Sequence, residues 1–149
     1  MKKIVATFAF LVVTLVSALC SAEIPAEEVA LGGIPLGALP EYVKQIYGEP
    51  TSYDRGRDGI VIYNYNDTFK IMFSGGKFMY WMETTANNGI KTPSGIGVGN
   101  DASVLDKYGD TYYDRTEDGI RKKAYWASGR VLLVFGIKNG KIVSIRAAC

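Results

Sequence analysis

The sequence predicts an α+β fold built from two tandem units, each a helix followed by a three-stranded antiparallel meander, with the helices packed on one face of the sheet. Three observations lead to this prediction. Residues 53–60, Tyr-Asp-Arg-Gly-Arg-Asp-Gly-Ile, return at 113–120 as Tyr-Asp-Arg-Thr-Glu-Asp-Gly-Ile, with six of eight positions identical. Apolar residues have a helical spacing before each octapeptide and alternate after it. Antiparallel sheets tolerate water on one face, so we expect the face without helices to be partly open.

The duplication extends over most of the chain. The segment 33–37, Gly-Ile-Pro-Leu-Gly, matches 95–99, Gly-Ile-Gly-Val-Gly. On this basis the chain divides into repeat 1 over 31–85, a linker over 86–94 and repeat 2 over 95–149. Asn, Gly, Pro and Ser residues mark the linker.

A short helix is predicted before each octapeptide. Apolar residues at spacings of three and four indicate one helix over 39–47 and a second over about 101–108. Pro40 suits the first turn of the first helix. Gly48 and Gly109 end the two helices, as glycine often does. Helices this short are stable only when they bury their apolar side on another element.

The segments after each octapeptide are predicted to be strands, because β-branched and aromatic residues alternate there. The predicted strands cover 60–65, 68–73, 78–83, 120–126, 131–137 and 142–147. The octapeptides themselves are interpreted as loops, in which Asp58-Gly59 and Asp118-Gly119 form tight turns into the next strand.

The N-terminus is typical of an export signal. Lys2 and Lys3 precede an apolar run from Ile4 to Leu19, and small residues follow up to Ala22, so we predict a signal peptide over 1–22. A transmembrane anchor is the structural alternative, but the apolar run is short for a membrane span. The predicted location is therefore periplasmic or extracellular.

The position of cleavage decides what becomes of Cys20. Cleavage after Ala22 removes this residue, and cleavage after Ala18 keeps it as a thiol. Lipidation of Cys20 is the third outcome, and it would make the protein a membrane-anchored lipoprotein. A retained Cys20 has Cys149 as a possible disulfide partner; otherwise Cys149 is free or is paired with another molecule.

The charge balance argues against a general affinity for nucleic acid. The chain has 17 basic and 15 acidic residues, and loss of Lys2 and Lys3 with the signal makes the two numbers equal. The bases are unevenly spread, because seven bases and no acids lie between Gly119 and the C-terminus. This segment either creates a positive field at one end of the domain or is a solvated edge protected by lysines.

A calcium site is the functional alternative for the octapeptides. Asp-x-x-x-Asp-Gly-Ile resembles the start of an EF-hand loop, but the twelfth positions are Tyr65 and Tyr125 where such a loop needs a bidentate Glu. Arginine inside each octapeptide also opposes a cation. We therefore expect no metal and no cofactor. The residues of the calcium alternative are Asp54, Asp58, Asp114 and Asp118.

The sequence predicts no enzyme. It contains no histidine, which removes the commonest general base and metal ligand. Cys149 has no histidine partner, and no glycine-rich loop ends in Lys-Ser or Lys-Thr. An enzyme would require Asp54 and Asp114 to converge in one cleft.

Aromatic residues carry the positive signal for function. The chain has ten Tyr and two Trp, many of them on predicted strands, where both alternating sets contain large side chains. Some of these rings should therefore lie on the open face as contact residues. The alternative is that they fill the core and pair across strands. The candidate partner-binding residues are Tyr63, Tyr65, Asp67, Tyr80, Trp81, Tyr125, Trp126, Arg121, Lys123 and Arg130.

Several motifs together resemble a known repeat. They are Ile34-x-x-Gly37 with Tyr47-Gly48-Glu49-Pro50, Ile96-x-x-Gly99 with Tyr108-Gly109, and Phe135 followed by Gly140-Lys141-Ile142-Val143. This pattern resembles β-lactamase inhibitor proteins and the related BamE (SmpA/OmlA) lipoproteins of outer-membrane assembly. The resemblance implies a concave sheet that grips a partner enzyme with aromatic residues and a loop carboxylate, for which Asp67 occupies a comparable hairpin. The internal disulfides of the inhibitors are missing here.

These inferences together predict an exported, non-catalytic protein-binding module of the cell envelope, similar to an inhibitor in its use of the exposed sheet face. Its expected partner is an envelope or secreted protein. The alternative is a structural or outer-membrane-assembly lipoprotein tethered through Cys20, and membrane contact is expected only in that case.

Overall fold

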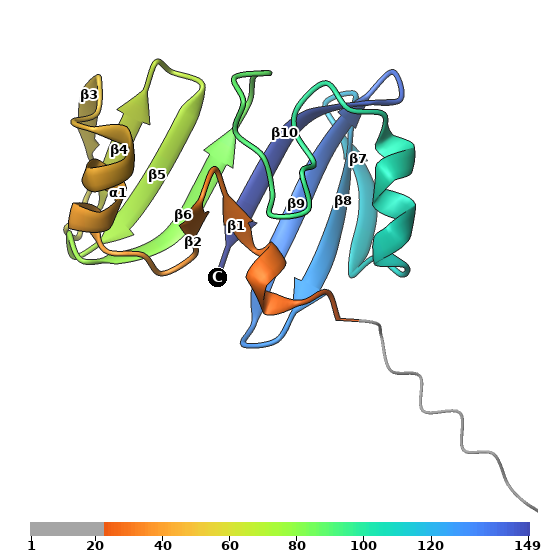
Figure 1. The fold of residues 1–149 in the computed structure, drawn as a ribbon, viewed down its shortest axis with the longest axis horizontal. Helices are drawn as coiled ribbons and strands as arrows, with labels where there is room; N and C mark the ends of the chain where they lie inside the picture. Colours follow the sequence, from red (N-terminus) through yellow and green to blue (C-terminus); the bar gives the residue numbers. More distant parts are fainter. Residues whose placement is uncertain (1–22) are drawn as a thin grey trace, which may run out of the picture.

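Eight antiparallel strands join edge to edge in one sheet, in the order β3-β4-β5-β6-β10-β9-β8-β7 (Figure 1). The computed structural model describes residues 23–149. The predicted signal peptide over 1–22 and the three outcomes for Cys20 lie outside the described residues. The strands are β3 (Ser52–Arg55), β4 (Val61–Tyr65), β5 (Phe69–Ser74), β6 (Phe78–Thr84), β7 (Tyr113–Glu117), β8 (Ile120–Ala127), β9 (Val131–Lys138) and β10 (Lys141–Ala148).

The chain builds the sheet inward from its two edges. Strands β3 to β6 run from one edge to the centre, and β7 to β10 run from the other edge to the centre. The two sets meet where β10 pairs with β6, for example at Ile145 with Thr84 and at Arg146 with Glu83. The sheet is therefore continuous from the first half of residues 23–149 to the second.

Short elements cover one face of this sheet, as Figure 1 shows. The helix α1 (Pro40–Tyr47) and the 3-10 helix η2 (Ala102–Tyr108) lie over opposite halves of it. Between them lie the 3-10 helix η1 (Ala26–Glu28) and the small hairpin of β1 (Ala30–Leu31) and β2 (Ile34–Pro35). We call this side the covered face.

The hydrophobic core lies between these elements and the sheet. Val43 of α1 and Leu105 of η2 are fully buried. The ring of Tyr47 lies 5.4 Å from that of Phe69, and the ring of Tyr108 lies 5.0 Å from that of Tyr125. Alternate strand residues point into this core, whereas their neighbours point to the other side. The largest fully buried strand residues are Phe69, Ile71, Phe73, Met79, Met82, Tyr125, Leu133, Phe135 and Ile142.

The opposite side, which we call the open face, has no helix or hairpin of residues 23–149 packed on it (Figure 1). Burial alternates accordingly along β9, where Leu132 and Val134 are half-buried while Leu133 and Phe135 are fully buried. Within residues 23–149 no helix has the length and apolarity needed to cross a membrane.

The predicted class of two α+β units with three-stranded meanders is wrong. The molecule is mostly β, with one eight-stranded sheet to which each octapeptide adds a further strand, β3 or β7. The octapeptides are predicted to be loops because of their Asp-Gly turns, yet the residues before each turn form exposed edge strands. The second helical segment is 3-10 in type rather than α, although it lies where a helix was predicted.

The two octapeptides fold differently although their sequences nearly match. In both, an Asp-Gly turn has both residues at positive φ, as in a tight hairpin. In the second, Glu117 pairs directly with Ile120. In the first, the Gly56 N–H donates to the Ile60 carbonyl, and the Ile60 N–H donates to the Arg57 carbonyl. Gly56 and Arg57 therefore both lie opposite the single residue Ile60. This is a β-bulge, and it shifts the pairing of β3 by one residue.

Candidate functional site

An apolar row crosses the open face at right angles to the strands. The strand pairings place its members side by side from β4 to β8, and all six are half-buried. We call this row the apolar stripe; its residues are Ile62, Met72, Trp81, Ala148, Leu132 and Trp126. Tyr112 is 59% exposed, and its ring lies 5.0 Å from that of Trp126, which lengthens the stripe toward the β7 edge. Apolar side chains of this size are typical of contact surfaces.

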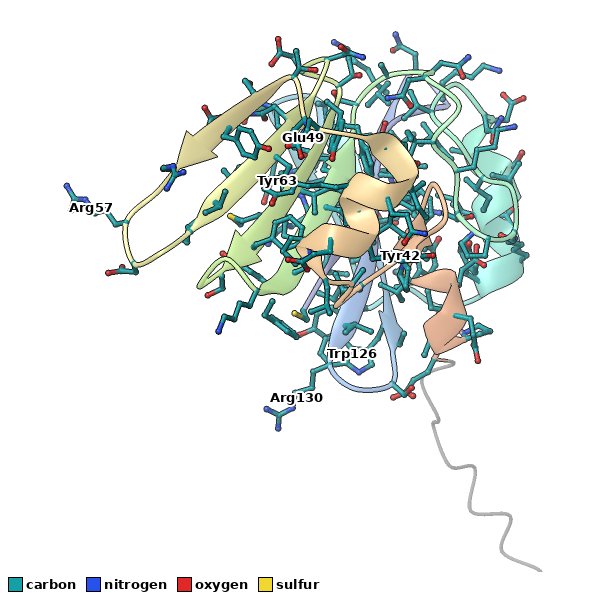
Figure 2. All side chains as sticks on the ribbon, turned by 60° about the vertical axis from the view of Figure 1, so that its left-hand side comes forward. Tyr42, Glu49, Arg57, Tyr63, Trp126 and Arg130 are labelled. Carbon is teal, nitrogen blue, oxygen red and sulfur yellow. The ribbon has the colours of Figure 1, made fainter. Side chains whose placement is uncertain are left out.

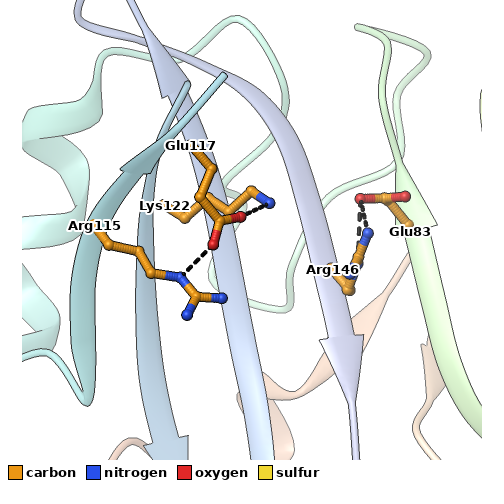
Figure 3. Close-up of polar contacts among 5 residues, drawn as sticks. All are labelled: Glu83, Arg115, Glu117, Lys122 and Arg146. Atoms are coloured by element: carbon orange, nitrogen blue, oxygen red, sulfur yellow. Dashed lines mark hydrogen bonds and ion pairs between the residues drawn. The ribbon is translucent and has the colours of Figure 1, made fainter. Parts of the chain in front are cut away.

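A cluster of five charged residues lies beside the stripe on the same face (Figure 3). Arg115 Nε lies 2.8 Å from Glu117 Oε1, and Lys122 Nζ lies 2.6 Å from Glu117 Oε2. Across the central strand pair, Arg146 Nη2 lies 3.0 Å from Glu83 Oε1. We call these five residues the charged cluster. Its three cations outnumber its two carboxylates, so it carries one excess positive charge.

The charged cluster and the apolar stripe are in direct contact. The Arg146 guanidinium lies 5.3 Å from the ring centre of Trp81, in a cation–π arrangement. The hydrogen bond from Lys122, with the added charge of Arg115, holds the pKa of the Glu117 carboxyl below its usual value. The Glu117 carboxylate therefore stays ionised at neutral pH.

A shallow cavity of about 80 Å³ lies within the charged cluster. Gly136 and Ser144 form part of its lining together with Tyr113. A Cβ atom at Gly136 would clash with Ser144 Oγ, so a side chain there would require Ser144 to change its rotamer. The open face thus offers apolar side chains, charged groups and a hollow within one surface.

Among the predicted aromatic contact residues, two tryptophans lie on this face and three tyrosines do not. Trp81 and Trp126 belong to the apolar stripe. Tyr63, Tyr65 and Tyr125, expected on the open face, lie instead in the core, where they are 8%, 9% and 1% exposed. Figure 2 shows Tyr63 beside α1. These tyrosines follow the alternative that aromatic rings fill the core.

The predicted basic and turn residues are separated from one another. Arg121 and Lys123 pair with Ile137 and Phe135, so they belong to the covered face. Arg130 lies at the tip of the β8–β9 hairpin, not far from Trp126 (Figure 2). Asp67 is exposed in the tight turn between β4 and β5. Tyr80 is the extra residue of a bulge in β6.

The octapeptide carboxylates do not converge. Asp54 accepts a hydrogen bond from Asn64 at 2.8 Å, and Asp114 accepts two from Arg121 at 2.7 and 2.6 Å. These carboxylates lie on β3 and β7, the opposite edges of the sheet. Asp58 and Asp118 occupy the turns. Within residues 23–149 no three His, Cys, Asp or Glu residues are grouped as a metal site would need.

Most of the charged cluster was missed in the sequence. The excess of basic residues after Gly119 indicated a positively charged region. Because successive strand residues point to opposite faces, however, Lys122 lies on the open face and its neighbours Arg121 and Lys123 lie on the covered face. A bulge between Ile142 and Ser144 then reverses the faces along β10, which brings Arg146 beside Glu83. No periodicity in the sequence reveals such a bulge.

No family model matches the chain, and no curated protein matches it in sequence. Solved structures are similar in fold. A cysteine-rich secretory protein from Staphylococcus aureus subsp. aureus Mu50 has a TM-score of 0.59 at 14% identity, with 86% of this chain and 49% of that chain covered. An extracellular protein containing a SCP domain from Bacillus anthracis str. Ames has a TM-score of 0.51 at 11% identity, with 76% and 43% covered.

A DUF4309 family protein from Bacillus subtilis subsp. subtilis str. 168 has a TM-score of 0.48 at 19% identity, with 86% of this chain and 88% of that chain covered. The chain spans less than half the length of the two SCP-type proteins, and at these identities the likeness concerns the fold alone. The resemblance to β-lactamase inhibitor proteins and BamE lipoproteins is wrong, because the structures similar in fold are a cysteine-rich secretory protein and an extracellular protein with a SCP domain. The motifs behind it, such as Tyr47-Gly48 and Tyr108-Gly109, mark helix ends common to many folds.

Proposed function

We propose that the protein is an exported, non-catalytic module that binds a protein partner on the open face of its sheet. The observation that carries this proposal is the apolar stripe, which crosses six neighbouring strands and is bordered by the charged cluster. Protein interfaces combine a Trp- and Tyr-rich apolar centre with arginine and a polar rim, and this face has the same composition.

Export rests on two supports. The sequence of residues 1–22 has the order of a signal peptide, with Lys2 and Lys3 before an apolar run. Two proteins of similar fold are described as extracellular or secretory. The partner would accordingly be a protein of the cell envelope or of the surrounding medium.

The shape of the face favours a macromolecule over a small substrate. Its hollow of about 80 Å³ is smaller than sites that enclose small molecules, which have roughly 300–1,000 Å³. The stripe is long and shallow, so a partner would cover it by lying across the strands. Arg115 and Lys122 would then meet carboxylates of that partner, because the cluster has one excess positive charge.

Site-specific photo-cross-linking tests the proposal. A photoreactive phenylalanine analogue replaces Met72 or Leu132 on the open face in the full chain, and Tyr42 on α1 in a control chain. We expect both open-face positions to give the same cross-linked protein in cells that produce the chain, with competition by excess unlabelled protein. Equal cross-linking from position 42, or none from the open face, would contradict it.

A further inference from the structure

A second, separate hollow lies on the covered face between α1 and strands β3 to β5. Its volume is about 330 Å³, within the range of small-molecule sites, roughly 300–1,000 Å³. Val61, Tyr63 and Phe73 form its apolar base, and Gly76 adds no side chain at its rim. The ring of Tyr63 lies 4.8 Å from that of Phe73 and 5.1 Å from that of Tyr53, so the base is largely aromatic.

Positive charge lies at the mouth of this cavity. Lys44 Nζ lies 5.6 Å from the ring centre of Tyr53 and 5.5 Å from that of Tyr63. It also lies 3.0 Å from Glu49 Oε2, and that carboxylate accepts a hydrogen bond from the Tyr53 hydroxyl. Figure 2 shows Glu49 at the end of α1, near Tyr63. A carboxylate is therefore already held at one side of the mouth.

Two further groups have no such partner. Arg55 lines the cavity and forms no ion pair with any residue of 23–149. Tyr63 also lines the cavity, and its hydroxyl is in no side-chain hydrogen bond within the same part of the chain. Because this hydroxyl is not enclosed by the protein, it can donate its proton to a ligand atom in the cavity. Because Glu49 neutralises Lys44, the guanidinium of Arg55 is the uncompensated positive charge in the lining of this cavity.

We propose that this cavity binds a small carboxylate with an aromatic or branched apolar body. The carboxylate lies between the Arg55 guanidinium and the Tyr63 hydroxyl, and the apolar body lies against Val61 and Phe73. Arginine matches a carboxylate with two parallel hydrogen bonds, which fixes the orientation of the ligand. Val61, Tyr63 and Phe73 then remove its apolar surface from water.

The other half of the sheet does not repeat this site. The hollow beside η2 contains Lys123 where the first half has Tyr63, and Arg121, which is already paired with Asp114. The bulge at Gly56 also turns Arg55 toward the covered face, whereas Arg115 points to the open face. The proposed ligand therefore binds once per chain.

NMR titration of the full-length chain with sodium benzoate and sodium phenylacetate tests the inference. Acetate supplies the charge without the apolar body, and benzyl alcohol supplies the ring without the charge. We expect saturable shifts centred on Val61, Tyr63 and Phe73 with both aryl carboxylates. Acetate and benzyl alcohol should bind at least tenfold more weakly.

Variants locate the contact. Arg55→Gln should weaken benzoate binding about tenfold or more, because it removes the bidentate partner. Tyr63→Phe should weaken it several-fold. Arg57→Gln is the matched control, an exposed arginine two residues away that does not line this cavity, and it should bind as the unmodified protein does.

Absence of saturable shifts at Val61 and Phe73 with either aryl carboxylate would overturn the inference. Equal weakening by Arg55→Gln and Arg57→Gln would overturn it too, because it would indicate attraction by overall charge. Because the titration of the unmodified chain already decides the first outcome, the test does not depend on the folding of any variant. The titration also does not involve the open face, so its outcome is independent of whether a protein partner binds there.

Discussion

Arg55 and Arg115 hold the same position in two matching octapeptides, yet their side chains lie on opposite faces of one sheet. Arg55 pairs with Val61 and lines the cavity beneath α1. Arg115 pairs with Lys122 and joins the charged cluster. A slip of one residue exchanges the faces of every side chain on a strand. The bulge in the first octapeptide supplies that slip.

The bulge predicts a specific coupling between Gly56 and Ile60. A Cβ atom at Gly56 would lie 3.1 Å from Ile60 Cβ and 3.3 Å from its Cγ2. Gly56→Ala should therefore destabilise the fold by about 1 kcal/mol through crowding. In an Ile60→Ala background the same change should cost less. Urea unfolding of the four proteins of this cycle measures the coupling, and strictly additive effects would show that the bulge does not crowd these residues.

A second prediction concerns the hairpin that covers the sheet. Gly32 and Gly33 both have positive φ, at 58° and 82°, so alanine at either position costs backbone strain of about 1 kcal/mol. A Cβ atom at Gly32 would also clash with the Tyr47 hydroxyl, which donates to the Gly32 carbonyl at 2.6 Å. At Gly33 no atom lies within 4 Å of the added group.

We therefore expect Gly32→Ala to cost clearly more than Gly33→Ala in thermal or urea unfolding, by about 1–2 kcal/mol. The pair forms its own control, since both changes carry the same strain. Equal losses would mean that Tyr47 moves aside without cost.

The buried carboxylate of Glu28 gives a pH-dependent prediction. It accepts hydrogen bonds from the Tyr108 and Ser94 hydroxyls, and Lys107 Nζ donates to Ser94. Burial alone would raise the pKa of the Glu28 carboxyl, but the hydrogen bonds from Ser94 and Tyr108 and the charge of Lys107 lower it below 4.5. A lowered pKa contributes stability above the ordinary value and loses it as the pH falls through the folded-state pKa.

Glu28→Gln should accordingly destabilise the protein by about 1–3 kcal/mol at neutral pH, because it disrupts a buried hydrogen-bond network. The difference in stability between the two proteins should narrow as the pH falls from the ordinary Glu value through the lowered pKa of the folded-state Glu28 carboxyl. Glu27→Gln, at an exposed neighbouring position, is the control and should show no such trend. A difference in stability that is constant with pH would contradict the lowered pKa of Glu28, because it would mean that the folded and unfolded states have the same pKa.

The two ion pairs of β10 should differ in how much they contribute to the free energy of unfolding. Arg146 pairs with Glu83, whose side chain is only 19% exposed, whereas Lys141 pairs with Asp101, whose side chain is 67% exposed. Arg146→Gln should cost about 1–2 kcal/mol in urea unfolding, since it leaves Glu83 partly buried without its partner. Lys141→Gln should cost at most about 0.5 kcal/mol. The reverse order would contradict the placement of Arg146 between Glu83 and Trp81.

The sequence located the strands better than it located their faces. Residues 60–65, 68–73 and 131–137 were predicted as strands, because their alternating aromatic and β-branched residues are buried on one side. Strands β3 and β7 were missed because exposed, charged edge residues carry no such alternation. Tyr63, Tyr65 and Tyr125 were expected on the wrong side of the sheet.

Bulges explain why the faces were not predictable. Three of them, at Gly56, at Tyr80 and between Ile142 and Ser144, each reverse the alternation within a strand. The charged cluster depends on pairing between β6 and β10, which are 57 residues apart from Thr84 to Lys141 and are joined only in the fold. Trp81 and Trp126 were correctly expected on strands, but only the pairing shows that they share a face.

The affinity for the partner identified by cross-linking decides whether the open face is the binding surface. Its dissociation constant is measured for the unmodified chain, for the double variant Trp81→Ala with Trp126→Ala, and for Tyr42→Ala on the covered side. If the open face is the binding surface, the double variant loses about a hundredfold or more in affinity while Tyr42→Ala binds normally. Unchanged affinity of the folded double variant, or an equal loss in Tyr42→Ala, would contradict the account.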